Sequence, residues 1–81
     1  MQRPIAFTKG ITSQSGAALV QLAGKYISTV QIAQGTKMVN AKSLMGVLSL
    51  ASSKAPGLLI VRGADEREAM AALGEYIESN W

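Results

Sequence analysis

Apolar residues in the last part of the chain recur at helical spacing along one side only. They fall at i, i+1, i+4, i+7 and i+8, and they are Ala69, Met70, Leu73, Tyr76 and Ile77. This pattern predicts an amphipathic helix with a single apolar stripe. Residues 13–25 and 43–50 carry one-sided helical patterns as well. Because a helix of this kind must bury its stripe against another layer, the chain has to supply a second layer.

Four short runs have the length and composition of strands, and they supply that layer. Within residues 4–8, Ile5 and Phe7 are two positions apart, so their side chains point towards one face of a strand. Residues 58–61 form a continuous apolar run. Residues 29–32 and 37–40 flank a turn that contains Gly35, which predicts a hairpin. The resulting order, β-α-β-β-α-β-α, predicts an α+β fold. We expect an open-faced two-layer sandwich: a four-stranded, mostly antiparallel sheet with three helices on one face.

Local signals indicate where the helices begin and end. Thr12 or Ser13 is the expected N-cap of the first helix, and Gly24 its stop. Asp65, with Glu68 three residues later, predicts a variant capping box at the last helix. Residues 52–57 read as a loop. Trp81 either frays or packs on the sheet edge, and the pattern leaves both open.

Two missing residue types exclude most catalytic chemistry. The 81 residues, 48% of them hydrophobic, support one domain over 1–81, yet they include no cysteine and no histidine. The chain therefore has no thiolate and no imidazole, either as a nucleophile or base or as a metal ligand. The five carboxylates fit a solvated face of the last helix: Asp65, Glu66, Glu68, Glu75 and Glu78. We expect no enzyme activity, no metal and no cofactor.

The charge pattern argues against two classes of partner. The net charge is +3, and the lysines are scattered at Lys9, Lys25, Lys37, Lys42 and Lys54. A nucleic-acid binder usually clusters its cations among aromatic side chains, and only four aromatic residues are present. No apolar run is long enough for a signal peptide or a membrane span. We expect a cytoplasmic protein without direct nucleic-acid or membrane contact, and the oligomeric state stays open.

Three segments resemble the HPr phosphocarrier family of the sugar phosphotransferase system. The most specific is VNAKSLMGVLSL at residues 39–50, which looks like the regulatory serine segment of that family. LVQLAGKY at residues 19–26 resembles the first helix, and RGADEREAMAAL at residues 62–73 resembles the entry to the last helix. The family's open-faced sandwich has the same element order. The resemblance covers nearly the whole chain and implies a bacterial protein of carbon catabolite regulation.

The chain departs from the family where the family carries its phosphoryl group. The family's loop reads Gly, an apolar residue and then His-Ala-Arg-Pro-Ala, whereas this chain has Thr12 at the histidine position and Gln14 at the arginine position. The family's Crh-like branch also lacks the histidine but keeps Ala-Arg-Pro-Ala. A threonine hydroxyl is not ionised near neutral pH, and a phosphothreonine is too stable an ester for a relay. We expect histidine-type phosphocarrier activity, and transfer through Thr12, to be absent.

By the same resemblance, Ser43 is a regulatory phosphosite, although a serine there also serves as an ordinary N-cap. Leu44, Met45 and Leu48 would form an exposed patch that binds partner proteins, the alternative being partly buried core. The implied partners are an HPr kinase/phosphorylase, a LacI-type catabolite regulator and transport-system proteins. The resemblance thus implies a regulatory docking protein of the phosphoenolpyruvate:sugar phosphotransferase system.

Two other functions stay open at this point. The start of the first helix could hold a phosphate, a phosphorylated small ligand or a carboxylate, through helix amides and the residues Thr12, Ser13, Ser15 and Gly16. The plainer interpretation of the same residues is a capped helix start. Alternatively, the patch at Leu44 could make the chain a constitutive adaptor that needs no phosphate on Ser43.

Overall fold

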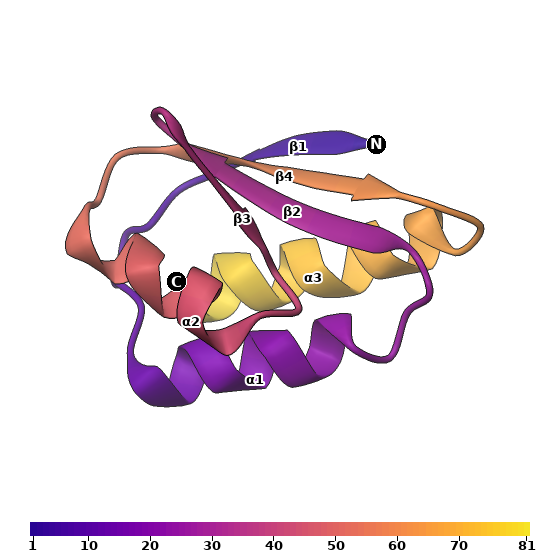
Figure 1. The fold of residues 1–81 in the computed structure, drawn as a ribbon, viewed down its shortest axis with the longest axis horizontal. Helices are drawn as coiled ribbons and strands as arrows, with labels where there is room; N and C mark the ends of the chain where they lie inside the picture. The colour runs from indigo at the N-terminus through magenta and orange to yellow at the C-terminus, as the bar shows by residue number, and fades with distance from the viewer.

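The computed structural model describes all residues, 1–81, as a sheet with helices on one face (Figure 1). The strands are β1 (Gln2–Ile5), β2 (Thr29–Gln34), β3 (Lys37–Asn40) and β4 (Gly57–Arg62). They pair in the order β1-β4-β2-β3, and every pairing is antiparallel. The helices are α1 (Ser13–Ala23), α2 (Leu44–Ser49) and α3 (Glu66–Asn80), and a short 3-10 turn, Leu50–Ser52, follows α2. The predicted open-faced α+β sandwich is confirmed.

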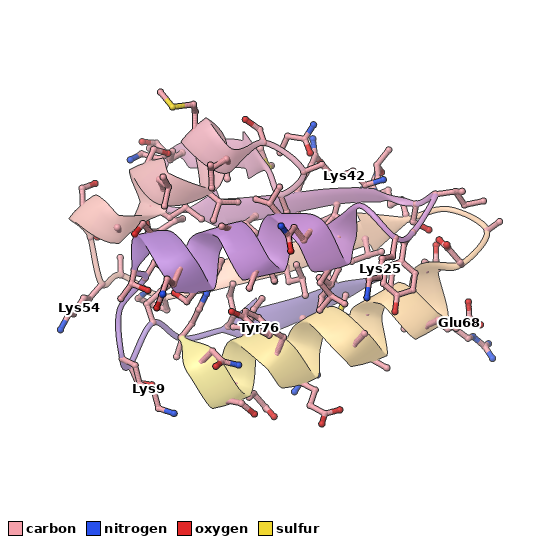
Figure 2. All side chains as sticks on the ribbon, turned by 90° about the horizontal axis from the view of Figure 1, so that it is seen from below. Lys9, Lys25, Lys42, Lys54, Glu68 and Tyr76 are labelled. Carbon is pink, nitrogen blue, oxygen red and sulfur yellow. The ribbon has the colours of Figure 1, made fainter.

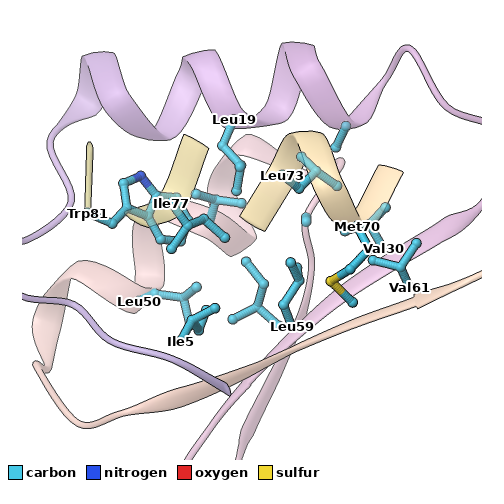
Figure 3. Close-up of a cluster of buried hydrophobic side chains, with 14 of the residues drawn as sticks. Ile5, Leu19, Val30, Leu50, Leu59, Val61, Met70, Leu73, Ile77 and Trp81 are labelled. Atoms are coloured by element: carbon cyan, nitrogen blue, oxygen red, sulfur yellow. The ribbon is translucent and has the colours of Figure 1, made fainter. Parts of the chain in front are cut away.

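A single core fills the space between the sheet and the helices (Figure 3). Leu19 of α1, Leu59 of β4 and Leu73 of α3 are fully buried there. The predicted stripe of α3 is confirmed at Ala69, Met70, Leu73 and Ile77, whereas Tyr76 is half-buried at its border. Val47 and Leu50, which lie three residues apart, point from α2 and its extension into the same core. Each helix therefore buries one side and leaves the other free.

The first strand lies earlier than the sequence predicts. β1 ends at Ile5, which pairs with Gly57, so the chain leaves the sheet where β4 begins. Phe7 lies beyond the strand but is still buried, because it packs against Trp81. Pro4 is the third residue of the strand and not its first, which is tolerated because β1 is an edge strand.

The predicted capping box at the start of α3 is wrong. The Asp65 side chain caps no α3 amide and instead accepts hydrogen bonds from the Ile27 amide, the Ser28 amide and the Ser28 hydroxyl. These hydrogen bonds hold the pKa of Asp65 below its ordinary value, and the bond from the Ser28 hydroxyl has the largest effect. Asp65 thus joins the beginning of α3 to the segment that leads into β2.

Three lysines from outside the helices donate to backbone carbonyl groups, two of which lie in the last turn of a helix. The Nζ atom of Lys9 lies 2.6 Å from the Ser79 carbonyl oxygen, and that of Lys37 lies 2.9 Å from the Ser49 carbonyl oxygen. The Lys42 Nζ atom donates to the carbonyl oxygen of Tyr26, just after α1, at 2.7 Å. No helix has a basic residue in its own last turn. Lys9 and Lys37, which come from other segments, therefore complement the negative ends of α3 and α2.

Candidate functional site

Ser43 is exposed and stands at the N-cap of α2. Its Oγ atom accepts a hydrogen bond from the Gly46 amide at 3.3 Å, and its carbonyl oxygen accepts one from Val47. The turn before it is fixed by the Asn40 side chain, which accepts from the Lys42 amide. The backbone thus presents the Ser43 hydroxyl to solvent at a defined place.

The predicted patch on α2 divides into two parts. Met45 is 81% exposed and Leu44 is 43% exposed, so both present apolar surface to solvent. Leu48 is half-buried, because its side chain lies against Gly16 of α1. The expectation of an exposed patch is thus met by two residues, and the third mainly joins α2 to α1.

Gly16 is the residue that lets the two helices approach. A Cβ atom at this position would lie 2.9 Å from Cδ2 of Leu48 and 3.4 Å from Cγ1 of Val47. We expected Gly16 only as part of an anion site. The sequence signal for the close contact is a glycine inside the first turns of a helix, where it costs helix stability unless packing requires it. The contact places the start of α1 beside α2.

The start of α1 is a complete capping box. The Thr12 Oγ1 atom accepts from the Ser15 amide at 3.0 Å, and the Ser15 Oγ atom accepts from the Thr12 amide at 2.9 Å. The two hydroxyls also lie 3.2 Å apart and share a hydrogen bond. Ser13 and Gln14 are exposed beside them, and the loop enters the helix through Gly10, whose φ is +79°. Thr12, and not Ser13, is therefore the N-cap, and the Thr12 and Ser15 hydroxyls are engaged with the helix itself.

A tyrosine from α3 holds the same turn. The Tyr76 hydroxyl donates to the Ser15 carbonyl oxygen at 3.0 Å. Burial raises the pKa of Tyr76 above its ordinary value, so the phenol stays protonated and remains a donor near neutral pH. The first turn of α1 is consequently fixed from inside by its cap and from α3 by Tyr76.

Charge is strongly segregated along the chain. All five carboxylates lie at positions 65–78, and every basic residue except Arg67 precedes them. Figure 2 shows Lys42 on the same side of α1 as α2, Glu68 near the first turn of α3 and Lys25 between them, whereas Lys9 and Lys54 lie at the other end of the molecule. No group of three or more His, Cys, Asp or Glu side chains is placed to hold a metal ion. No helix has the length and apolar character needed to cross a membrane.

Comparisons with known proteins point in one direction. Residues 3–79 match the family model described as PTS HPr component phosphorylation site. The chain is 40% identical over 78 residues to HPr-like protein Crh of Halalkalibacterium halodurans. This match covers 95% of this chain and 93% of the relative. It is 40% identical over 65 residues to phosphocarrier protein HPr of Cupriavidus necator, covering 79% of this chain and 73% of the relative.

A solved structure agrees with these sequences. The crystal structure of HPr-C-His from Thermoanaerobacter tengcongensis superposes with a TM-score of 0.87 at 36% identity. The match covers 98% of this chain and 92% of that one.

Proposed function

Because the chain belongs to the HPr family of the sugar phosphotransferase system, we propose that it is a regulatory docking protein of that system without histidine phosphocarrier activity. One observation carries the proposal: an exposed serine hydroxyl, Ser43, lies directly beside the exposed side chains of Leu44 and Met45. A serine that can be phosphorylated next to an apolar surface allows the phosphate to control the binding of a partner protein at that surface.

Phosphorylation of Ser43 is compatible with the fold. The hydroxyl is exposed at a helix N-cap, where added negative charge faces the positive end of α2. Lys42 lies beside it, and no carboxylate precedes position 65 in the chain to repel the phosphate locally. We therefore propose that a phosphate on Ser43 changes the charge of the α2 surface without unfolding α2. The proposed kinase is an HPr kinase/phosphorylase, and the proposed reader is a catabolite regulator.

The absence of carrier activity follows from chemistry at the start of α1. The chain has no histidine at any position, so no imidazole can take and release a phosphoryl group. The Thr12 hydroxyl, which stands at the family's histidine position, is engaged with Ser15 and has no neighbouring base. Incubation with phosphoenolpyruvate and the general kinase of the transport system is expected to leave the chain unlabelled. Stoichiometric label on Thr12 would overturn this part of the proposal.

Phosphorylation by an HPr kinase/phosphorylase with ATP tests the regulatory part. Intact mass and site mapping are expected to find one phosphate, on Ser43, that Ser43→Ala abolishes. Ser52→Ala is the matched control, because Ser52 is also exposed and its hydroxyl also bonds within its own turn. A histidine-bearing HPr confirms that the kinase is active. If the kinase labels that HPr but not this chain, Ser43 is only a cap and the regulatory function is wrong.

Partner binding distinguishes regulated from constitutive docking. The proposal predicts that a catabolite regulator binds the phosphorylated chain and not Ser43→Ala. Met45→Ser, compared in its fully phosphorylated form, should weaken that binding without disturbing the fold, because the Met45 side chain is 81% exposed and outside the core. Binding that is equal for Ser43→Ala and the phosphorylated chain would instead identify a constitutive adaptor.

A further inference from the structure

A cavity opens where the chain leaves β1 and α3 comes to its end. Its volume is about 460 Å³, within the range of about 300–1,000 Å³ that is typical of small-molecule sites. Apolar side chains line it, among them Ile5, Ala6, Pro56 and Ile77. The polar side chains in the lining are those of Arg3, Thr8 and Glu78. An apolar hollow with a few polar groups is typical of a site for a small organic ligand.

The Arg3 guanidinium is held in place by α3. Its Nη2 atom donates to the Glu78 Oε1 atom at 2.6 Å. A Cβ atom at Gly74 would collide with the guanidinium, so this glycine in the middle of α3 leaves the space that the Arg3 side chain occupies. A glycine inside a helix lowers stability unless packing requires it. Arg3 makes no other hydrogen bond, so its remaining N–H groups are free to donate to a ligand.

Two residues that line the cavity have backbone amides without a hydrogen-bond partner. They are Ala6 and Thr8, which follow the edge strand β1. Met1 exchanges backbone hydrogen bonds with Val61. Because bonded pairs alternate in an antiparallel ladder, Pro4 turns its backbone to the free edge. Pro4 has no N–H, so this edge cannot bond a complete extra strand, and a small ligand is a better occupant than an extended peptide.

Three cations and one carboxylate lie around the cavity. The Lys9 Nζ atom donates to the backbone carbonyl of the residue after Glu78, and Figure 2 shows Lys54 at the same end of the molecule as Lys9. Glu78 is the one carboxylate in the lining, and its side chain is 70% exposed. Glu75 lines the groove between α1 and α3 instead. With Arg3 included, the balance of charge is positive, and a ligand with one negative charge complements it.

We propose that this cavity binds a small monocarboxylic acid with an apolar hydrocarbon part. The carboxylate accepts hydrogen bonds from the Arg3 guanidinium and the Ala6 amide, and the hydrocarbon part covers Ile5 and Ile77. A cationic ligand is repelled by Arg3, and a ligand without a hydrocarbon part leaves the apolar lining in water. Glu78 competes with the ligand for Arg3, so their ion pair opposes binding. No residue of α2 takes part, and the proposal therefore stands apart from the proposed function.

Titration with isocaproate, followed by the amide resonances of the chain, tests the site. Two controls separate the parts of the ligand: isocaproamide has the same shape without the charge, and acetate has the charge without the hydrocarbon part. Concentrations up to about 10 mM are needed, because ligands of this size bind weakly. Isocaproate should cause saturable shifts at residues 5–8 and 77–78. Both controls should bind about tenfold more weakly or less, as expected when a charged hydrogen bond or apolar burial is lost.

Arg3→Gln should abolish the shifts that isocaproate causes. Arg62→Gln is the matched control and should bind normally, because Arg62 is exposed at the opposite end of β4 from the cavity. Glu78→Gln removes the competing carboxylate and should tighten binding about two- to fivefold, the range of an exposed ion pair. Glu75→Gln makes the same change of charge outside the cavity and should change the affinity less.

Three results would overturn the proposal. The first is the absence of saturable shifts with isocaproate. The second is equal binding of isocaproate and either control, because one half of the proposed ligand would then contribute nothing. The third is weaker binding by Glu78→Gln, because Glu78 would then hold the ligand and not compete with it. This third test does not depend on Arg3→Gln, so it decides the matter even if that variant fails to fold.

Discussion

The ring of Phe7 stacks on the indole of Trp81, with centroids 5.7 Å apart and an interplanar angle of 24°. The Lys9 amide donates to the Trp81 carbonyl oxygen at 2.5 Å, so the backbone is joined at the same place. Trp81 is fully buried, and its Nε1 atom has no hydrogen-bond partner. This contact fixes the segment that leads from β1 to the start of α1. It also answers the question that the sequence left open, because Trp81 is core and not frayed.

Trp81→Ala should lower the free energy of unfolding by about 3–5 kcal/mol, since truncating a buried tryptophan leaves a cavity. Denaturant titration followed by far-UV circular dichroism measures the loss, because the variant has no tryptophan left for fluorescence. Ile27→Ala is the control, with Ile27 77% exposed, and should change stability by less than about 0.5 kcal/mol. Equal losses for the two variants would show that the Trp81 contact contributes little.

Gly63→Ala should destabilise the fold more than Gly35→Ala, although both glycines have positive φ. Gly63 has φ of +152°, and a Cβ atom there would lie 2.7 Å from the Ser28 Cα atom. Gly35 has φ of +62° and open space around it, so alanine there costs only the left-handed backbone, about 1–2 kcal/mol. Denaturant midpoints of the two variants check the order. A smaller loss for Gly63→Ala would mean that Ser28 moves away without cost.

Asp65 should make stability fall in acid. Its pKa in the folded chain is below the ordinary value of 3.8, so its contribution is fully present above pH 3.8 and is lost as the pH falls through the folded-state pKa. Asp65→Asn should reduce the slope of unfolding free energy against pH in that range. Glu68→Gln is the control, because no hydrogen bond or ion pair engages Glu68. An unchanged slope in Asp65→Asn would contradict the assignment.

Phosphate should not bind at the start of α1. The Thr12 and Ser15 hydroxyls are engaged in the capping box, which leaves too few free donors to replace the hydration of an anion. Millimolar inorganic phosphate is therefore expected to leave the amide resonances of residues 12–16 unchanged. Saturable shifts at those residues would restore the anion-binding alternative. A sulfate titration at equal ionic strength separates specific shifts from general salt effects.

Most of the fold was predictable because local pattern and tertiary packing agree. The hairpin was expected at residues 29–32 and 37–40, and β2 and β3 occupy Thr29–Gln34 and Lys37–Asn40. The helix at residues 43–50 was placed within one residue at each end. The first strand was predicted too far along the chain, because Ile5 and Phe7 are both buried but only Ile5 pairs with another strand. Alternation reports burial, and it does not tell a strand from an extended segment held by side chains.

The candidate site was less predictable because its contacts join distant segments. Ser43 and Thr12 could be expected as N-caps, since capping acts within three residues. Asp65 was misassigned because its amide partners, Ile27 and Ser28, lie 38 and 37 residues away. The bonds from Lys9, Lys37 and Lys42 to backbone carbonyl groups could not be predicted either, because they also join different elements. The exposure of a predicted surface residue depends on such contacts as well. Leu48 is half-buried because it packs against Gly16 of α1.

The place of β1 in the sheet has a consequence for synthesis on the ribosome. β1 pairs only with β4, whose first residue is Gly57, and the segment after β1 is held by Trp81. Translation proceeds from the N-terminus, so β1 is made well before the strand that it pairs with. Residues 1–9 lack these partners until residues 57–81 have been made. Contacts of such long sequence separation make the fold close in one late step, and not progressively as the chain elongates.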